Sequence, residues 1–272
     1  MAARDSLAIV IVTYNSRGDI DACLKSIVGH TKPFPTTITV VDNASPDGTG
    51  DYVRAKWPDV EVIDAGANLG FARANNLGIR ATHSDYVLLM NPDTVAPPGA
   101  IPTLVRGLAS HADAAVAGAR LLSATGFPEL SWGRAITPWN ELTQKIFSSL
   151  YHRKVRAVVR YVDKLSRTAR EVPWVSGACM VIRRADLEAV GLLDERFFMY
   201  TEDVDLCVEI GKRGRKVLYV AGAEVLHHRG HSAAQNPDTE RLRRLSHIAY
   251  YNKHLPRWAP LLRAYLKASG KP

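Results

Sequence analysis

One short motif in the middle of the chain has the residue types that bind a divalent cation beside phosphate groups. Asn91-Pro92-Asp93 follows four apolar residues, 87–90, so we expect Asp93 at the end of a buried strand. A carboxylate in that position can bind Mg²⁺, whose other ligands are phosphate oxygens and water. Taken alone, the motif is more typical of an Asn-Pro-Asp turn that caps the next helix.

A second acidic motif, Glu202-Asp203 with Asp205, has the surroundings of a general base. It follows an apolar-aromatic run, residues 197–200, that can remove water from a neighbouring carboxylate. Loss of water raises the pKa of a carboxylate and suits it to accept a proton near neutral pH. Acidic residues also stabilise the first turn of a helix. Both interpretations hold together if one carboxylate caps the helix and the other is catalytic.

Histidines in the last third of the chain are candidates for a further metal ligand. His227 and His228 follow a short apolar run, and His231-Ser232 comes shortly after. Adjacent residues on a strand point to opposite faces, so only one of the first pair can enter a given cleft. That histidine could complete a metal site with Asp93, although a lone histidine is as often structural.

The segments that would position these groups have the sequence pattern of an α/β fold. Apolar runs at 7–12, 37–42, 60–63 and 86–90 alternate with helix-like segments, which predicts parallel strands covered by helices. Ligands bind at the carboxyl ends of such strands. Each of the four runs is followed by short polar residues, which predicts a cleft able to bind a nucleotide. The segments after the runs are Thr13-Tyr14-Asn15, Asp42-Asn43-Ala44-Ser45, residues 68–73 and Asn91-Pro92-Asp93-Thr94.

The turn after the first strand excludes two nucleotide-binding classes. Residues 13–19, TYNSRGD, have neither the GxGxxG spacing of a dinucleotide fold nor a Walker loop. The second half of the chain is less regular, with strands predicted at 174–182, 216–220 and 223–227. Helices are predicted from Glu202 and over about 238–255. The polar segment 229–237 is interpreted as a lid over the donor or as a plain connection.

Composition is that of a globular protein in a reducing compartment. The 272 residues carry a net charge of +8 and are 46% hydrophobic, and the three cysteines form no CxxC pair. The first apolar run is too short for a membrane span or a signal-peptide core, so we expect a cytoplasmic protein.

Positive charge is concentrated in two segments, with +7 over 145–170 and +6 over 238–272. In the first of them an apolar stripe at helical spacing lies beside the basic residues, which predicts a basic amphipathic helix. Such a helix either rests on an anionic membrane or packs on its own domain. Nucleic acid is disfavoured as a partner because no recognised motif accompanies the charge.

Seven segments in order along the chain resemble the inverting family 2 glycosyltransferases, and more narrowly their bacterial rhamnosyltransferase-like branch. The matching segments are IVIVTYNS (9–16), VVDNAS (40–45), NLGFARANN (68–76), LLMNPD (88–93), VSGACMVIRR (175–184), LLDERFFMYTEDVDLC (192–207) and HHRGHS (227–232). The resemblance implies a GT-A fold, with a mostly parallel central sheet flanked by helices.

The same resemblance implies how the chain is organised. One domain would span 1–237, with a nucleotide-sugar-binding half at 1–120 and a less regular acceptor and catalytic half at 121–237. The second half would contain a basic helical insert at about 138–170. A basic helical tail would follow at 238–272.

The resemblance also implies site roles, residue by residue. Thr13, Tyr14 and Asn15 would line the base and ribose, and Asp42 would accept the N3–H of a uracil or thymine ring. Further donor-binding residues would be Asn43, Asn68, Gly70, Phe71, Asn75 and Asn91. Asp93 would bind Mg²⁺ or Mn²⁺ with His227, or with His228 if the register differs. Asp203 would be the general base, with Glu202 beside it in the catalytic pair.

Two positions depart from the family pattern. Asn91 replaces the first carboxylate of the usual Asp-x-Asp. Glu209 stands where the family often has arginine, so Lys212 or Arg213 would have to supply a basic contact to the diphosphate.

The activity implied is a metal-dependent, inverting transfer of a sugar, rhamnose by preference, from a dTDP- or UDP-sugar. The acceptor would be a lipid-linked or cell-surface polysaccharide glycan, and the basic segments would rest on the inner face of the plasma membrane. A sugar nucleotidyltransferase is the first alternative, but its Gly-rich basic loop is reduced here to Arg17-Gly18. A non-catalytic glycan- or nucleotide-binding module is the second, and the presence of Asp93 and Asp203 argues against it.

Overall fold

The protein is an α/β structure built on one large twisted sheet. The computed structural model describes residues 5–228 and 238–268. The strands are β1 (Leu7–Thr13), β2 (Thr36–Asp42), β3 (Glu61–Asp64), β4 (Tyr86–Met90), β5 (Thr94–Val95), β6 (Ala114–Ser123), β7 (Trp132–Gly133), β8 (Arg170–Glu171), β9 (Trp174–Val175), β10 (Cys179–Arg183) and β11 (Lys216–His227). The helices are α1 (Ile20–Ile27), α2 (Thr49–Lys56), α3 (Gly70–Arg80), α4 (Ala100–Ala109), α5 (Pro138–His152), α6 (Arg156–Ser166), α7 (Arg184–Ala189), α8 (Glu202–Lys212), α10 (Thr239–His254) and α11 (Ala259–Ala268).

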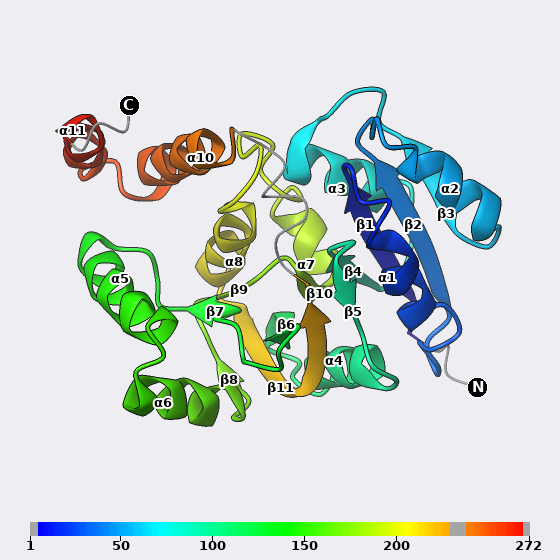
Figure 1. Ribbon diagram of the computed structural model, residues 1–272, viewed down its shortest axis with the longest axis horizontal. Helices are drawn as coiled ribbons and strands as arrows, with labels where there is room; N and C mark the ends of the chain where they lie inside the picture. The colour runs from blue at the N-terminus through cyan, green and yellow to red at the C-terminus, as the bar shows by residue number, and fades with distance from the viewer. Residues whose placement is uncertain (1–4, 229–237, 269–272) are drawn as a thin grey trace.

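The sheet has the strand order β3-β2-β1-β4-β10-β6-β11-β5, and β8 pairs with β11 beside this path. Its first half is parallel: β1 pairs with β2 and β4, and β2 pairs with β3. β10 enters antiparallel between β4 and β6. The short strands β5 and β8 pair antiparallel with β11, which itself runs parallel to β6. The predicted mostly parallel sheet is therefore confirmed, with β10 antiparallel near its middle (Figure 1).

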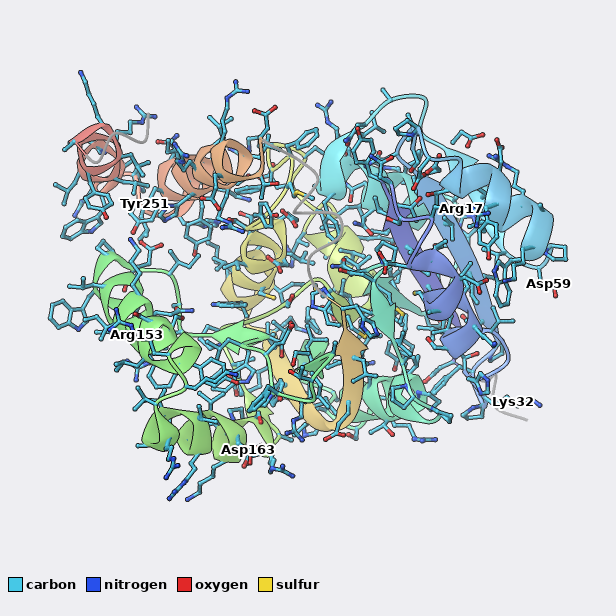
Figure 2. The ribbon with its side chains drawn as sticks, in the orientation of Figure 1. Arg17, Lys32, Asp59, Arg153, Asp163 and Tyr251 are labelled. Atoms are coloured by element: carbon cyan, nitrogen blue, oxygen red, sulfur yellow. The ribbon has the colours of Figure 1, made fainter. Side chains whose placement is uncertain are left out.

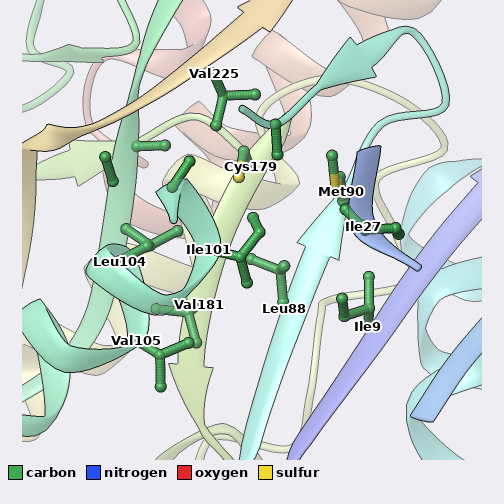
Figure 3. Close-up of a cluster of buried hydrophobic side chains, with 14 of the residues drawn as sticks. Ile9, Ile27, Leu88, Met90, Ile101, Leu104, Val105, Cys179, Val181 and Val225 are labelled. Carbon is green, nitrogen blue, oxygen red and sulfur yellow. The ribbon is translucent and has the colours of Figure 1, made fainter. Parts of the chain in front are cut away.

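Apolar side chains on both faces of the sheet bind the covering helices. On one face, strand residues such as Ile9 and Leu88 pack against Ile27 of α1 and Ile101 of α4 in a continuous buried cluster (Figure 3). On the other face, α3, α7 and α8 cover a second cluster. Strands buried on both sides must be apolar throughout, which is why β1 and β4 read as unbroken apolar runs.

The prediction of a single strand at 174–182 is wrong, because the structure has two short strands there. β9 ends at Val175 and β10 begins at Cys179, so Ser176, Gly177 and Ala178 form a turn between them. This turn contributes backbone groups to the cavity described below. The two strands expected at 216–220 and 223–227 are instead one strand, β11, whose pairing with β6 shifts register between Val220 and Glu224.

The basic segment is two helices, α5 and α6, not the single amphipathic helix that its periodicity predicts. The chain turns between them, because Lys154 has a positive φ of 55° and Val155 is extended. α5 is capped by Thr137, the residue before its first turn, whose Oγ1 accepts a hydrogen bond from the backbone N–H of Asn140 at 3.2 Å.

The C-terminal tail packs on the second half of the sheet domain. Tyr250 and Tyr251 of α10 join Phe197 and Val204 in a third buried cluster. Ser246 Oγ also donates to the carbonyl of Met199 at 2.7 Å. Figure 1 shows α5, α6, α10 and α11 together on the side away from β1–β3. Among residues 5–228 and 238–268, no helix has the length and apolar character that crossing a bilayer requires.

Candidate active site

A cavity of about 500 Å³ opens where β1, β2 and β4 end, at the edge of the sheet where parallel strands place ligands. One wall comes from the segments that follow these strands and from the start of α3. The opposite wall comes from the β9–β10 turn, the segment before α8, the end of β11 and one residue of α10. The lining residues are Val12, Tyr14, Ser16, Asn43, Asn68, Gly70, Phe71, Asn91, Pro92, Asp93, Ser176, Gly177, Ala178, Phe198, Met199, Tyr200, Thr201, Glu202, Asp203, His227 and Arg243.

Most of the residues predicted for the site meet at this cavity. Those on its wall are Tyr14, Asn43, Asn68, Gly70, Phe71, Asn91, Asp93, Glu202, Asp203 and His227. Five predicted residues are not on the wall: Thr13, Asn15, Asp42, Asn75 and His228. The roles expected of these five stay predictions, and the expected lid, 229–237, lies outside the described residues.

The off-wall residues at the ends of β1 and β2 hold those strand ends together. Thr13 Oγ1 donates to Asp42 Oδ1 at 3.0 Å, and the backbone N–H of Ser45 donates to Asp42 Oδ2 at 3.3 Å. Asn15 has a positive φ of 55°, and its backbone N–H donates to Ser45 Oγ at 3.1 Å. These bonds set the course of the two loops that carry Tyr14 and Asn43 to the cavity.

Asn43 fixes the start of α3. Its Nδ2 donates to the carbonyl of Gly70 at 3.1 Å, and its Oδ1 accepts from the backbone N–H of Leu69 at 3.1 Å. Two residues further on, Phe71 donates its backbone N–H to the carbonyl of Phe198 at 2.6 Å. The start of α3 is thus hydrogen-bonded both to the loop after β2 and to the segment that leads into α8. Within α3, Asn75 Nδ2 donates to the carbonyl of Phe71 at 2.9 Å.

Gly70 is required where α3 meets that segment. It has a positive φ of 79°, and a Cβ built on it would lie 2.3 Å from the carbonyl oxygen of Phe198. Both the backbone conformation and the close approach exclude a side chain here.

Asp203 is held at the cavity wall by two backbone donors. The N–H of Gly177 donates to its Oδ2 at 2.9 Å, and the N–H of Val204 donates to its Oδ1 at 2.8 Å. Burial raises the pKa of Asp203 above its ordinary value, although these two hydrogen bonds oppose the shift. The carboxylate is therefore oriented and is a stronger proton acceptor than an exposed aspartate.

Glu202 lies beside Asp203 in a drier setting. Its side chain is buried, and Oε2 has no hydrogen-bond partner among the described residues. Burial, followed by the charges of Asp203 and Asp205, raises the pKa of Glu202 well above its ordinary value. The preceding residues Tyr200 and Thr201 both have positive φ, 70° and 73°, a strained backbone of the kind found at functional sites.

Asp93 and His227 meet at the other end of the cavity. His227 Nε2 lies 3.3 Å from Asp93 Oδ1, and Nδ1 lies 2.9 Å from Glu129 Oε2. Burial lowers the pKa of His227, but the hydrogen bonds with Asp93 and Glu129 outweigh it and raise the pKa to about 9. His228 is exposed, and its backbone N–H donates to the carbonyl of Asp93 at 2.8 Å. Of the histidine pair, His227 is the one on the cavity wall.

The donor set at this end fits a divalent cation. Two ligand atoms that each lie about 2.1 Å from the same ion, with a right angle between the two bonds, are about 3 Å apart. Asp93 Oδ1 and His227 Nε2 are 3.3 Å apart, which is close to that separation. Glu129 is an acceptor only, so Nδ1 donates to it. With its raised pKa the imidazole also carries a proton on Nε2, which faces Asp93, and a cation bound there would displace that proton. Sequence reasoning missed Glu129, because nothing in the segment around it marks it as functional and its partner is 98 positions away.

Arg243 is the second residue that sequence reasoning missed. It reaches the cavity from α10 in the basic tail, and its guanidinium carbon lies 4.8 Å from the centre of the Tyr200 ring. Neither Lys212 nor Arg213 lines the cavity, contrary to what their place in the sequence suggested. The basic charge of the tail was the available signal, and it was interpreted only as a surface feature.

A further group, Asp205, Glu209 and His254, gathers between α8 and α10 with its ligand atoms within 4.8 Å of one another. Lys253 already supplies a positive charge there, because its Nζ lies 2.8 Å from Asp205 Oδ1 and 3.4 Å from Glu209 Oε1. His254 Nε2 is 2.6 Å from the same Asp205 oxygen. We interpret this group as an ion-pair cluster that attaches α10 to α8.

Both the sequence and the fold of the chain are similar to those of known glycosyltransferases. The family model described as glycosyl transferase family 2 matches residues 8–191. An N-acetylglucosaminyl-diphospho-decaprenol L-rhamnosyltransferase of Mycobacterium tuberculosis is 32% identical over 260 residues, covering 92% of this chain and 82% of that one. The rhamnosyltransferase WbbL of Escherichia coli is 24% identical over 183 residues, covering 61% of this chain and 64% of that one.

Among solved structures, the mannosyltransferase PcManGT of Pyrobaculum calidifontis, in complex with GDP-Man and Mn²⁺, has the same fold. It superposes with a TM-score of 0.63 at 19% identity, over 97% of this chain and 70% of that one. The predicted GT-A architecture is confirmed by this likeness. The family match covers more than half of the chain, including the wall of the cavity formed by the ends of β1, β2 and β4, and the M. tuberculosis relative is 32% identical over 92% of the chain. The chain therefore belongs to glycosyl transferase family 2 and is a glycosyltransferase.

Proposed function

We propose that the protein is a metal-dependent, inverting glycosyltransferase that moves rhamnose from a dTDP- or UDP-sugar to a lipid-linked glycan. One observation carries the mechanism: the oriented carboxylate of Asp203 lines the same cavity as the Asp93–His227 pair. This arrangement supports a mechanism in which one cavity holds both the proton acceptor and a phosphate-binding cation. The M. tuberculosis relative, an L-rhamnosyltransferase of a decaprenol-linked sugar, supports the choice of sugar and acceptor.

The nucleotide occupies the half of the cavity formed by the ends of β1, β2 and β4. Tyr14, Asn43 and Asn68 face the base and ribose. Asp42 accepts the N3–H of uracil or thymine, since a carboxylate has about four lone-pair sites and the protein bonds described above use two. Arg243, from the opposite wall, provides positive charge for the diphosphate.

Asp93 and His227 are the residues that would hold the metal, Mg²⁺ or Mn²⁺, with Glu129 behind His227. A cation held by them would supply positive charge against the negative charge that develops on the departing diphosphate. The protein's own contribution is orientation. Glu129 accepts a hydrogen bond from Nδ1 and fixes the imidazole with Nε2 toward Asp93, as carboxylates behind metal-binding histidines generally do.

Asp203 removes the proton of the acceptor hydroxyl as that oxygen attacks the anomeric carbon. Its two backbone hydrogen bonds fix the carboxylate, and its raised pKa strengthens it as a base. A single displacement inverts the anomeric centre. Glu202, with its raised pKa, completes the catalytic pair and keeps negative charge beside Asp203 low.

We further propose that residues 1–120 form the donor-binding half and 121–237 the acceptor and catalytic half, with 238–272 as a tail. The protein acts in the cytoplasm at the inner face of the plasma membrane. The nucleotidyltransferase alternative is disfavoured by Arg17, which stacks on Tyr52 at 3.2 Å and does not line the cavity. The binding-module alternative is disfavoured by the orientation of Asp203 toward the cavity.

The test is a calorimetric titration of UDP, dTDP, GDP and ADP with and without Mn²⁺. Wild type is compared with Asp93→Ala and with a matched control, Asp59→Ala, an exposed residue far from the cavity (Figure 2). We expect Mn²⁺-dependent binding of dTDP or UDP that Asp93→Ala loses and Asp59→Ala keeps. Absence of binding for all four nucleotides would remove the glycosyl-donor assignment.

A further inference from the structure

Large apolar side chains are exposed mainly on one side of the protein. Of the thirteen that are exposed among the described residues, ten fall within 139–161 and 245–265. These segments comprise α5, the start of α6, α10 and α11, which lie together in Figure 1 on the side away from β1–β3. A soluble protein with no partner rarely gathers so many apolar side chains in one region.

α5 presents a continuous apolar ridge to solvent. Four of its side chains recur at helical spacing, and Trp139 is the most exposed at 70%. The other three are Leu142, Ile146 and Leu150. The helix is attached to the body by other side chains, since Tyr151 Oη donates to the carbonyl of Pro128 and Tyr251 Oη donates to Glu141 Oε2, both at 2.5 Å. Other side chains of α5 thus bind it to the body, while Trp139, Leu142 and Ile146 are each more than half exposed.

α11 extends this ridge. Lys145 Nζ of α5 lies 5.3 Å from the centre of the Tyr265 ring of α11, so the two helices are neighbours. Tyr265 and Leu261 of α11 are exposed, as is Trp258 just before the helix. We call the set of seven residues the docking face. It consists of Trp139, Leu142, Ile146, Leu150, Trp258, Leu261 and Tyr265.

Unneutralised positive charge flanks the docking face. Residues 145–170 carry +7, and Arg156 and Arg160 of α6 are exposed and pair with no carboxylate in the described part of the chain. Tryptophan and tyrosine beside basic residues are typical of surfaces that lie in the headgroup region of a bilayer. A second copy of the chain is a poorer occupant. A two-fold interface would bring this patch against its own equivalent, and the like charges would repel.

The docking face is connected to the active site through α10. Arg243 of this helix lines the cavity, and Ser246 Oγ bonds the carbonyl of Met199 in the cavity wall. Further along α10, Tyr251 bonds Glu141 of α5. One helix thus links the cavity to the apolar ridge.

We propose that the docking face is the surface by which the enzyme binds an anionic lipid bilayer, with the basic face of α6 contacting the headgroups. This inference deepens the proposed function, on which it rests for the lipid-linked acceptor. A membrane at this face presents a lipid-borne sugar to the side of the cavity that α10 lines.

Vesicle co-sedimentation tests the proposal. Wild type is mixed with phosphatidylcholine vesicles that contain or lack phosphatidylglycerol, over a range of salt concentrations. An apolar triple variant, Trp139→Ser/Ile146→Ser/Leu261→Ser, removes side chains that are each more than half exposed, so the core is untouched. A charge variant is Arg156→Glu/Arg160→Glu. Its matched control is Lys25→Glu/Lys32→Glu, both exposed and outside the basic segments.

We expect wild type to bind anionic vesicles and to lose affinity steeply with salt. The charge variant should weaken binding at least about tenfold, since one basic side chain near an anionic surface contributes about fivefold. The triple variant should also weaken it at least about tenfold, because burial of one large apolar side chain contributes about tenfold or more. The control should stay within about twofold of wild type. Nucleotide binding, measured by calorimetry without vesicles, should be equal in all four proteins, because the changes lie away from the cavity.

Three results would overturn the proposal. One is no binding of wild type to anionic vesicles, and another is equal binding by the triple variant. The third is a wild-type dimer in sedimentation that the triple variant converts to a monomer without any vesicle binding, which would assign the face to self-association. Because the nucleotide titration is read separately, each of these results leaves the proposed function standing or falling on its own measurement.

Discussion

Replacing Asp203 with asparagine removes the proposed proton acceptor while leaving the side chain almost the same size. The carboxylate accepts two backbone N–H groups, from Gly177 and Val204, at 2.9 and 2.8 Å. An asparagine side chain has one acceptor oxygen and one NH₂ group, so it can satisfy only one of the two. The substitution therefore has a catalytic effect and a separate structural effect.

The structural effect is one backbone N–H left without a partner, which costs about 1–3 kcal/mol of unfolding free energy. Removal of a carboxylate whose ionisation burial disfavours offsets part of that cost. The catalytic effect is larger. A positioned general base contributes about 10²–10⁴-fold to the rate, so kcat should fall by that factor. Donor affinity should change little, because Asp203 is assigned to the acceptor hydroxyl and makes no proposed contact with the nucleotide.

The assay is steady-state turnover with dTDP- and UDP-sugars, beside calorimetric binding of the nucleotide and urea unfolding. Asp59→Asn, at an exposed position, is the matched control. In wild type, activity should be lost as pH falls through the raised pKa of Asp203, because the base must be ionised. If Asp203→Asn keeps more than about a tenth of wild-type kcat with the same pH profile, Asp203 is not the base.

Other substitutions test the surroundings of the site. Glu202→Gln should stabilise the fold increasingly as pH rises above about 4.5. In wild type, Glu202 ionises in the unfolded state above that pH, whereas its raised pKa keeps it protonated in the folded state to higher pH. Each unit by which the pKa is raised corresponds to about 1.4 kcal/mol of unfolding free energy. Urea unfolding of both proteins at pH 5 and 8 measures the difference in stability, and a difference that does not change with pH contradicts the prediction. Gly70→Ala should lower the free energy of unfolding by roughly 2–4 kcal/mol and weaken nucleotide binding, because its Cβ would overlap the carbonyl of Phe198. Thermal unfolding measures the stability and titration with dTDP measures the affinity, and a variant as stable as wild type would show that the contact relaxes. Glu129→Gln should weaken Mn²⁺ binding about 10–100-fold by releasing His227; Mn²⁺ electron paramagnetic resonance gives the affinity, and an unchanged value would leave Glu129 a purely structural partner.

The donor half of the fold could be predicted because local pattern and tertiary environment agree there. β1 and β4 are buried on both faces, so their apolar runs mark them directly. Since parallel strands end at one edge, the polar residues after them were expected to meet, and Tyr14, Asn43 and Asp93 do. These inferences need only periodicity and the geometry of a parallel sheet.

The second half could not be predicted to the same extent because its features depend on long-range contacts. The turn at Gly177 interrupts an apolar run that carries no breaking signal except one glycine. The break between α5 and α6 contains neither glycine nor proline. Arg243 reaches the cavity, and Glu129 contacts His227 in the cavity wall, from segments distant in sequence, and a single sequence does not reveal such partners.

The measurement that tests the central claim most directly is the anomeric configuration of the product. Wild type and Asp203→Asn are given a dTDP- or UDP-sugar, Mn²⁺ and a polyprenyl-diphospho-N-acetylglucosamine acceptor, and the new linkage is followed by proton NMR. Our account predicts an inverted anomeric centre, release of the nucleoside diphosphate, and almost no product from the variant. Retention of configuration, or release of pyrophosphate, would contradict a single displacement driven by Asp203.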